Sequence, residues 1–284
     1  MNFRTMLLAT AAVMVASSAS AKSFTDFTNP FALPTKGKVY SETKVQTSRL
    51  KLDDGKEKSK YKEFYASEEL MVGVGENTAL VGYIGNTFDS HTDDEKEKLQ
   101  LNNDHNFNYG FGVRYNHDFG KVLTQVGVMY RTMDEQSFFG QNYKKEDNNR
   151  WAKALEGTIK VGYETDCGMT PYTSFKVLGD IDSNNNEQAY SWFVGAHKVW
   201  DKTAVDAGVR YDFGKSAEVK TGGDLGDGRN EAFYLQGSVD YYVTDNVTLG
   251  AYGEYFLGGD FDSDTHYKDV DYNYTVGLAA KVLF

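Results

Sequence analysis

Cysteine, proline and long apolar runs are scarce in this chain of 284 residues. A single cysteine, Cys167, cannot form an internal disulfide bond, so the chain is not a disulfide-rich scaffold. The mean hydropathy of −0.55 excludes a bundle of membrane-spanning helices, because each of them needs about 20 predominantly apolar residues. Only 3 prolines interrupt the chain, which leaves it free to form long strands.

Basic residues are also fewer than acidic ones: the chain has 30 Lys and Arg against 41 Asp and Glu, which gives a formal net charge of −11. Nucleic-acid binding needs clustered Lys and Arg side chains, so we expect no nucleic-acid partner. Low hydropathy with high charge is typical of disorder, but the 20 Tyr, 18 Phe and 3 Trp argue against it, because disordered chains contain few aromatic residues. A polar chain rich in Tyr and Gly is instead typical of long strands with alternating faces.

The N-terminus has the features of a secretory signal peptide over residues 1–21. Arg4 supplies the positive charge, Met6–Ala16 the apolar stretch, and Ala19–Ala21 the small-residue cleavage site. A membrane anchor is disfavoured, because an apolar run of about 11 residues is too short to cross about 30 Å of hydrocarbon. We therefore expect export and cleavage before Lys22.

An irregular tail is expected at residues 22–36, and period-two alternation then runs through 37–284. This period is typical of strands with one apolar and one polar face. Twelve such segments are predicted: Val39–Leu52, Tyr61–Val74, Ala79–Phe88, Phe107–His117, Lys121–Met133, Trp151–Thr165, Thr170–Ile181, Tyr190–Trp200, Ala204–Gly214, Ala232–Val243, Val247–Gly258 and Val270–Phe284.

Short and long connections alternate between these segments. Asp118–Gly120 and Asp201–Thr203 are short, whereas Asp89–Asn106 and Ser216–Glu231 are long. Hairpins of a membrane barrel show this alternation, with turns on one side of the membrane and loops on the other, and a soluble sandwich has no reason to show it. The segments are also long enough to cross the hydrocarbon when tilted. We predict an all-β fold: an antiparallel, up-and-down transmembrane β-barrel of about 12 strands with its acidic loops outside.

The last residues resemble the terminal strand of bacterial outer-membrane β-barrel proteins. Gly277, Ala280, Val282 and Phe284 match the assembly signal of that family, although Ala280 is smaller than usual at its position. The resemblance implies a porin-like protein of the Gram-negative outer membrane. It further implies contact with membrane lipid and lipopolysaccharide, and recognition by the barrel-assembly machinery.

The sequence contains no motif that indicates catalysis, a metal or a cofactor. His197 lies in a predicted strand with no Ser placed for it by a recognisable motif, and the other histidines lie in or beside connections. The acidic stretches Asp89–Glu97 and Asp260–Asp264 lack the full spacing of a Ca²⁺ loop. We therefore predict no catalytic residue, no metal site, no cofactor and no enzymatic activity.

Charged residues of both signs on the inward faces carry the functional signal. An Arg-rich, acid-poor lumen would favour acidic solutes, and this mixture does not. Two interpretations stay open: a narrow channel for small polar solutes, or a closed barrel with a structural or surface-interaction role. An outer-membrane lipid hydrolase is a weaker third. The lumen-lining candidates are Arg114, Arg131, Glu156, Lys160, Lys176, Asp206, Arg210, Asp240 and Glu254.

The adjacent residues Glu68 and Glu69 conflict with strict alternation. One of the two must face lipid, where an acidic group costs about 1 to 3 kcal/mol depending on its depth. A β-bulge, or a position near the rim of the barrel, would remove the conflict.

Overall fold

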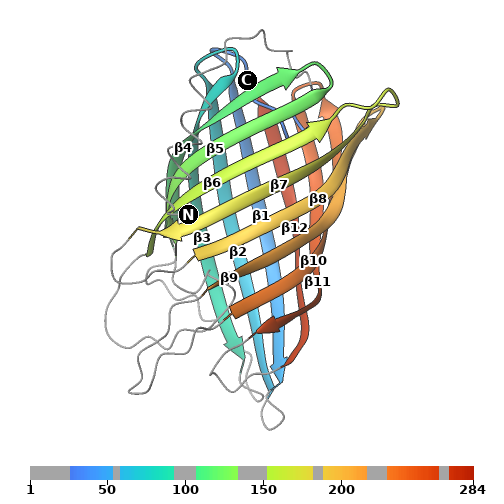
Figure 1. Ribbon diagram of the computed structural model, residues 1–284. Coiled ribbons are helices and arrows are strands. Elements are labelled where there is room, and N and C mark those ends of the chain that lie inside the picture. The colour runs from blue at the N-terminus through green and yellow to red at the C-terminus, as the bar shows by residue number, and fades with distance from the viewer. Residues whose placement is uncertain are drawn as a thin grey trace.

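A closed barrel of twelve antiparallel strands forms the protein (Figure 1). The computed structural model describes residues 26–53, 58–92, 107–133, 152–181, 188–215, 229–261 and 269–284. No helix in these ranges is long and apolar enough to cross a membrane. The predicted antiparallel barrel is confirmed. Its strands are β1 (Val39–Asp53), β2 (Lys58–Gly73), β3 (Thr78–Thr92), β4 (Phe107–Phe119), β5 (Val122–Met133), β6 (Ala152–Tyr163), β7 (Met169–Asp180), β8 (Gln188–Trp200), β9 (Thr203–Lys215), β10 (Arg229–Thr244), β11 (Val247–Phe261) and β12 (Asp269–Leu283).

The first and last strands close the barrel. β1 pairs with β12 in antiparallel register, with Tyr40 opposite Leu283. Two backbone hydrogen bonds complete the seam, from Val39 N to Phe284 O at 3.3 Å and from Phe284 N to Val39 O at 2.8 Å. Closure leaves no edge strand with unpaired backbone groups, which is a condition for a sheet that is surrounded by lipid.

Several strands extend beyond their predicted ends, and the longest extensions lie at the side of the long connections. β2 begins at Lys58 rather than Tyr61, and β3 reaches Thr92 rather than Phe88. β10 likewise begins at Arg229. Polar residues here break the apolar alternation, but their backbone N–H and C=O groups still pair with the neighbouring strand, which prolongs the ladder. Most residues of the long connections lie outside the described ranges.

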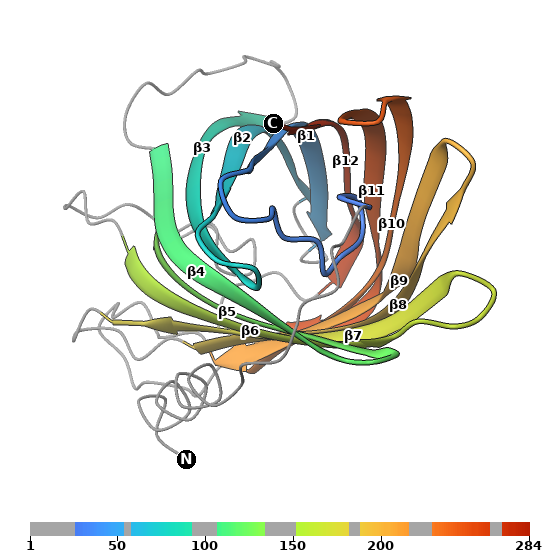
Figure 2. The ribbon, with the colours of Figure 1, turned by 90° about the horizontal axis from the view of Figure 1, so that it is seen from above.

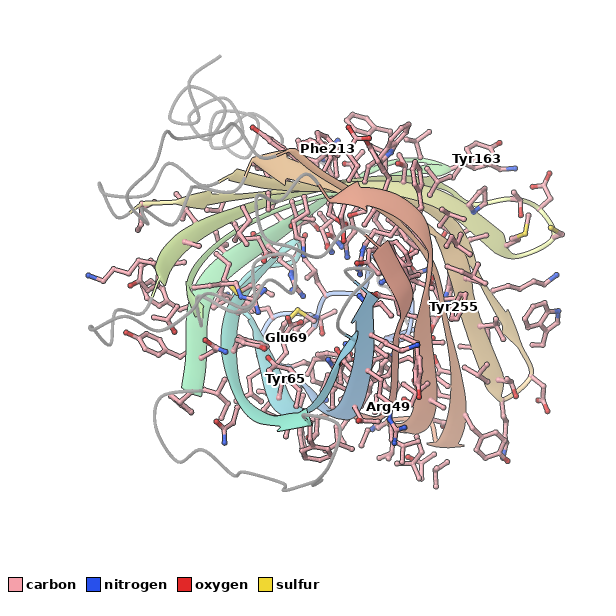
Figure 3. The ribbon with its side chains drawn as sticks, turned by 90° about the horizontal axis from the view of Figure 1, so that it is seen from below. Arg49, Tyr65, Glu69, Tyr163, Phe213 and Tyr255 are labelled. Atoms are coloured by element: carbon pink, nitrogen blue, oxygen red, sulfur yellow. The ribbon has the colours of Figure 1, made fainter. Side chains whose placement is uncertain are left out.

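The outer face of the barrel is apolar and the inner face polar. Phe111, Val209 and Val239 point outward with exposed fractions of 62%, 42% and 49%, whereas Arg114 and Arg210 line an interior cavity. Figure 3 shows the same division, with Tyr163 and Phe213 outside the wall and Glu69 inside. The barrel is therefore inverted relative to a soluble one, as the strand lengths predict.

Glu68 and Glu69 follow strict alternation without a bulge. The register of β2 with β1 and with β3 runs through both residues unshifted. Glu69 points inward and binds Arg114. Glu68 lies on the outer face, where its two carboxylate oxygens accept hydrogen bonds from the hydroxyls of Ser41 and Thr43 on β1. These two hydroxyls reduce the cost of an acidic group on this face.

We predict that Val209→Lys destabilises the refolded protein by about 2 to 4 kcal/mol, because a charge near the middle of the lipid-facing wall is poorly solvated. Urea titration of the protein in lipid vesicles, followed by tryptophan fluorescence, measures this loss. Ser238→Lys is the matched control, because Ser238 lines the interior cavity and its register partner on β9 is Asp206. Equal destabilisation by the two substitutions would contradict the assignment of the faces.

Candidate functional site

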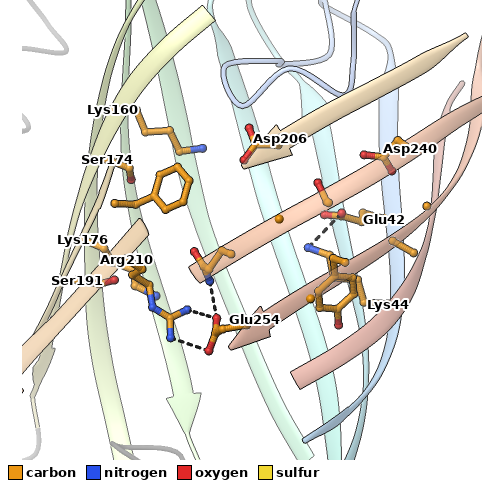
Figure 4. A pocket seen from close by; sticks show the side chains of 18 of the residues that line it. Glu42, Lys44, Lys160, Ser174, Lys176, Ser191, Asp206, Arg210, Asp240 and Glu254 are labelled. Carbon is orange, nitrogen blue, oxygen red and sulfur yellow. Dashed lines mark hydrogen bonds and ion pairs between the residues drawn. The ribbon is translucent and has the colours of Figure 1, made fainter. Parts of the chain in front are cut away.

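The barrel encloses a charged cavity of about 670 Å³ (Figure 4). Eight of the nine candidate residues line it: Arg114, Glu156, Lys160, Lys176, Asp206, Arg210, Asp240 and Glu254. The ninth, Arg131, does not line the cavity but binds Glu156, which does. Sequence reasoning missed three further lining charges, Glu42, Lys44 and Lys281. Glu42 and Lys44 belong to β1, where both faces carry polar residues and alternation does not mark the inner one.

Two arginines on β4 and β5 bind carboxylates that belong to other strands of the barrel. Arg114 holds Glu69 of β2 with both terminal nitrogens, at 2.7 and 2.8 Å. Arg131 donates to Glu156 of β6 at 2.9 Å, and its guanidinium lies 4.5 Å from the centre of the Tyr83 ring. Planar guanidinium groups suit such forked and stacked contacts, so these side chains are held in fixed positions.

Arg210 on β9 is the centre of a second group of charges. Its terminal nitrogens bind Glu254 of β11 at 2.5 and 2.9 Å, and its Nε binds Asp212 at 2.9 Å. The guanidinium lies 4.5 Å from the centre of the Tyr234 ring. Gln236 of β10 also donates to Glu254, at 2.5 Å. This group connects three adjacent strands across the inner wall.

A third group of charges lies between β12, β10 and β1. Lys281 Nζ is 2.8 Å from Asp240 Oδ2 and 3.9 Å from Glu42 Oε1. Lys44 Nζ is 3.1 Å from the same Glu42 oxygen. The cations and carboxylates of this wall therefore balance one another locally.

Residues 26–36, which we call the N-terminal strap, run inside the ring of strands (Figure 2). Phe27, Phe31 and Leu33 are buried. Phe27 packs edge-on against Tyr40 of β1 and Tyr242 of β10, and the Phe31 ring packs against Tyr172 of β7. These partners come from opposite parts of the wall, so the strap crosses the interior. Whether the tail enters the lumen could not be read from the sequence.

Two backbone carbonyls of the strap are held by the wall. Lys160 Nζ of β6 donates to the Pro30 carbonyl at 2.8 Å, and Asn116 Nδ2 of β4 donates to the Phe31 carbonyl. Gly162 leaves the room that the Phe31 ring needs, since a Cβ there would lie 2.7 Å from ring atoms. The strap is thus fixed by specific contacts at its centre.

Asp26 fixes the start of the strap. Its carboxylate accepts hydrogen bonds from His197 Nε2 at 2.9 Å, from the Tyr242 hydroxyl, and from the hydroxyl and the backbone N–H of Thr28. Burial by itself would raise the pKa of Asp26, but the hydrogen bonds from His197, Thr28 and Tyr242 outweigh it and lower the pKa from 3.8 to about 2. Asp26 is therefore held as a carboxylate.

His197 is buried on the inner face between two carboxylates. Its Nε2 contacts Asp26, and its Nδ1 lies 3.8 Å from Asp206 Oδ2. Asp206 in turn accepts hydrogen bonds from the Tyr172 hydroxyl at 3.0 Å. His197 therefore connects Asp26 of the strap to Asp206 of β9.

No group of three His, Cys, Asp or Glu side chains in the described ranges is placed to hold a metal ion. The acidic stretches Asp89–Glu97 and Asp260–Asp264 lie outside the residues whose side chains the structure describes.

Replacing Arg114 by Met is expected to lower the free energy of unfolding by about 2 kcal/mol, because the Glu69 carboxylate loses two charge-assisted hydrogen bonds inside the barrel. Denaturant titration in vesicles measures the change. Lys121→Met is the control, since the Lys121–Asp166 pair is mostly exposed and should contribute less than about 1 kcal/mol. The double change Arg114→Met with Glu69→Met should recover part of the loss, and an undiminished loss would contradict the pairing.

Acid should release the strap. The pKa of Asp26 is about 2 in the docked state and 3.8 ordinarily, so its stabilisation is complete above pH 3.8 and is lost as the pH falls towards 2. A nitroxide at Thr35→Cys, in a Cys167→Ser background, reports strap mobility by electron paramagnetic resonance. With Asp26→Asn the label should be mobile at neutral pH and change little in acid. A strap that stays immobile in that variant would refute the anchoring role.

No family model and no curated protein matches the sequence. Among solved structures, an outer membrane channel from Pseudomonas putida F1 superimposes with a TM-score of 0.63 and 12% identity, covering 90% of this chain and 98% of that chain. The transport unit of the autotransporter AIDA-I from Escherichia coli superimposes with a TM-score of 0.50 and 10% identity, covering 98% of this chain and 97% of that chain.

These likenesses concern the fold, since the identities are low. They agree with the closed barrel, the apolar outer face and the polar cavity. The chain has the fold of outer-membrane β-barrel proteins.

Proposed function

We propose that the chain is a channel of the bacterial outer membrane for passive diffusion of small polar solutes. The observation that carries the proposal is the charged cavity of about 670 Å³ inside a closed barrel with an apolar outer face. Its lining contains six cations (Lys44, Arg114, Lys160, Lys176, Arg210, Lys281) and five carboxylates (Glu42, Glu156, Asp206, Asp240, Glu254). This balance favours weak selectivity for the sign of the solute's charge.

We propose that the N-terminal strap limits the size of the solutes. The strap crosses the interior at the end of the barrel where the short turns lie. The side chain of Phe31, a residue of the strap, is fully buried there. Its carbonyls are bound by Lys160 and Asn116, so it narrows the lumen at a fixed place. Solutes would pass beside the strap or when it is displaced.

The proposal includes no catalytic role. Among the described residues, the two ring nitrogens of His197 face the carboxylates of Asp26 and Asp206 rather than a nucleophile. A histidine in this setting supports the strap, and no base is left for acyl or phosphoryl chemistry at this position.

Planar-bilayer recording of the refolded protein tests the channel. We expect discrete conductance steps, and deletion of residues 26–34 should raise the conductance by about twofold or more, because pore diameter limits ion flow. Liposome swelling with uncharged polyols of increasing size measures the solute limit, which should rise in the deletion variant. Folding of each preparation is checked by heat-modifiable gel migration. Folded protein that never conducts, with and without the strap, would eliminate the channel.

A second candidate is a closed barrel with a structural or surface-interaction role. The inner ion pairs and the docked strap favour it, because both fill the lumen with mutually bound groups. In that case neither the wild-type protein nor the variant that lacks residues 26–34 would conduct in the bilayer. Cell binding that survives changes in the lumen but is lost on deletion of 89–106 would then support this role.

A further inference from the structure

Two lysines differ from the other cations of the cavity. Arg114, Arg210 and Lys281 each lie within 2.8 Å of a carboxylate oxygen, and Lys44 lies within 3.1 Å of one. Lys176 has no ion pair or hydrogen bond with any described residue, although it lines the cavity. Lys160 binds only the Pro30 carbonyl, which is uncharged. Among the described residues, neither lysine of the β6–β7 wall therefore lies within ion-pair distance of a carboxylate.

The register places the two lysines on the same face of adjacent strands. Lys160 on β6 is opposite Ser174 on β7, and Lys176 lies two residues further along β7, opposite Thr158. Diagonal neighbours of this kind are roughly 7 to 8 Å apart, and their side chains share one face of the sheet. Both lysines can thus approach a single small anion in the cavity.

The carboxylate nearest in register attracts Lys176 electrostatically, but its hydrogen bond is made with an arginine. Glu156 lies two residues before Thr158 on β6 and is therefore diagonal to Lys176. Arg131 of β5 holds the Glu156 carboxylate at 2.9 Å. The remaining lining carboxylates come from β1, β9, β10 and β11; of these, Asp206 of β9 faces Lys160 and accepts hydrogen bonds from the Tyr172 hydroxyl (Figure 4).

Neutral groups suited to a hydroxylated molecule surround the two lysines. Ser191 of β8 is opposite Lys176, and Ser174 is opposite Phe193; all of them line the cavity. The Phe193 ring lies against two glycines, since a Cβ at Gly195 or Gly208 would come within 2.5 Å of its Cζ atom. The ring is thus held flat on the wall. It offers an apolar surface beside hydroxyl donors and ammonium groups.

We propose that Lys176, with Lys160 and Ser191, forms a subsite for the carboxylate of a small hydroxylated organic acid. The proposal rests on the channel function, because the solute would occupy this site during its passage. The ammonium groups bind the carboxylate, the serine hydroxyls bind the solute's hydroxyl groups, and its carbon skeleton lies on the Phe193 ring.

Direct binding tests the subsite independently of conduction. Gluconate and sorbitol share a six-carbon hydroxylated skeleton and differ in the carboxylate, so they form a matched pair of probes. Saturation-transfer NMR of the refolded protein in detergent should detect gluconate and give little signal for sorbitol. Lys176→Gln should weaken gluconate binding about tenfold, as expected for the loss of one charge-assisted contact, whereas Lys176→Arg should retain it.

Lys44→Gln is the control, because it removes the same charge from the same cavity at a lysine that is paired with Glu42. Gluconate binding that is equal in wild type and Lys176→Gln, or that is reduced equally by Lys44→Gln, would overturn the subsite. If Lys176→Gln does not fold, Lys160→Gln replaces it as the test variant, and it is also expected to weaken gluconate binding. Binding without bilayer conductance would leave the subsite standing and refute the channel; conductance without gluconate binding would do the reverse.

Discussion

The hydrogen bonds between β1 and β12 are the constraint on which the rest of the structure depends. A sheet surrounded by hydrocarbon cannot leave backbone N–H and C=O groups unpaired, because each such group costs several kcal/mol. The bonds between Val39 and Phe284 complete the seam and leave no open edge. Closure in turn separates an outer face, which must be apolar, from an inner face that can hold charges.

Charges inside the barrel are held by partners from other strands. Arg114 connects β4 to β2, Arg210 connects β9 to β11, and Lys281 connects β12 to β10. These contacts offset the loss of hydration and cross-brace the wall. The strap uses the same chemistry, since Lys160 and Asn116 bind its carbonyls and His197 binds Asp26. Stability and the width of the lumen therefore depend on the same set of side chains.

Alternation along single strands made the faces predictable. The outward direction of Phe111 and Val209, and the inward direction of Arg114 and Arg210, follow from the period of two that any strand imposes. The pairing of charges did not follow, because Arg114 and Glu69 are 45 residues apart in the chain. The inner face of β1 was missed as well, since both of its faces carry polar residues and only the closed barrel shows that Glu42 and Lys44 line the cavity while Ser41 and Thr43 do not.

By itself the sequence determined the class of fold, the twelve strands and the side of the wall on which most residues lie, because these depend on a local period and on strand length. Only the tertiary structure decided what fills the lumen. The strap has no periodicity, and its partner Tyr242 lies 216 residues from Asp26. Which ammonium groups meet a carboxylate, and that Lys176 meets none among the described residues, depends on distances that exist only once the barrel is closed.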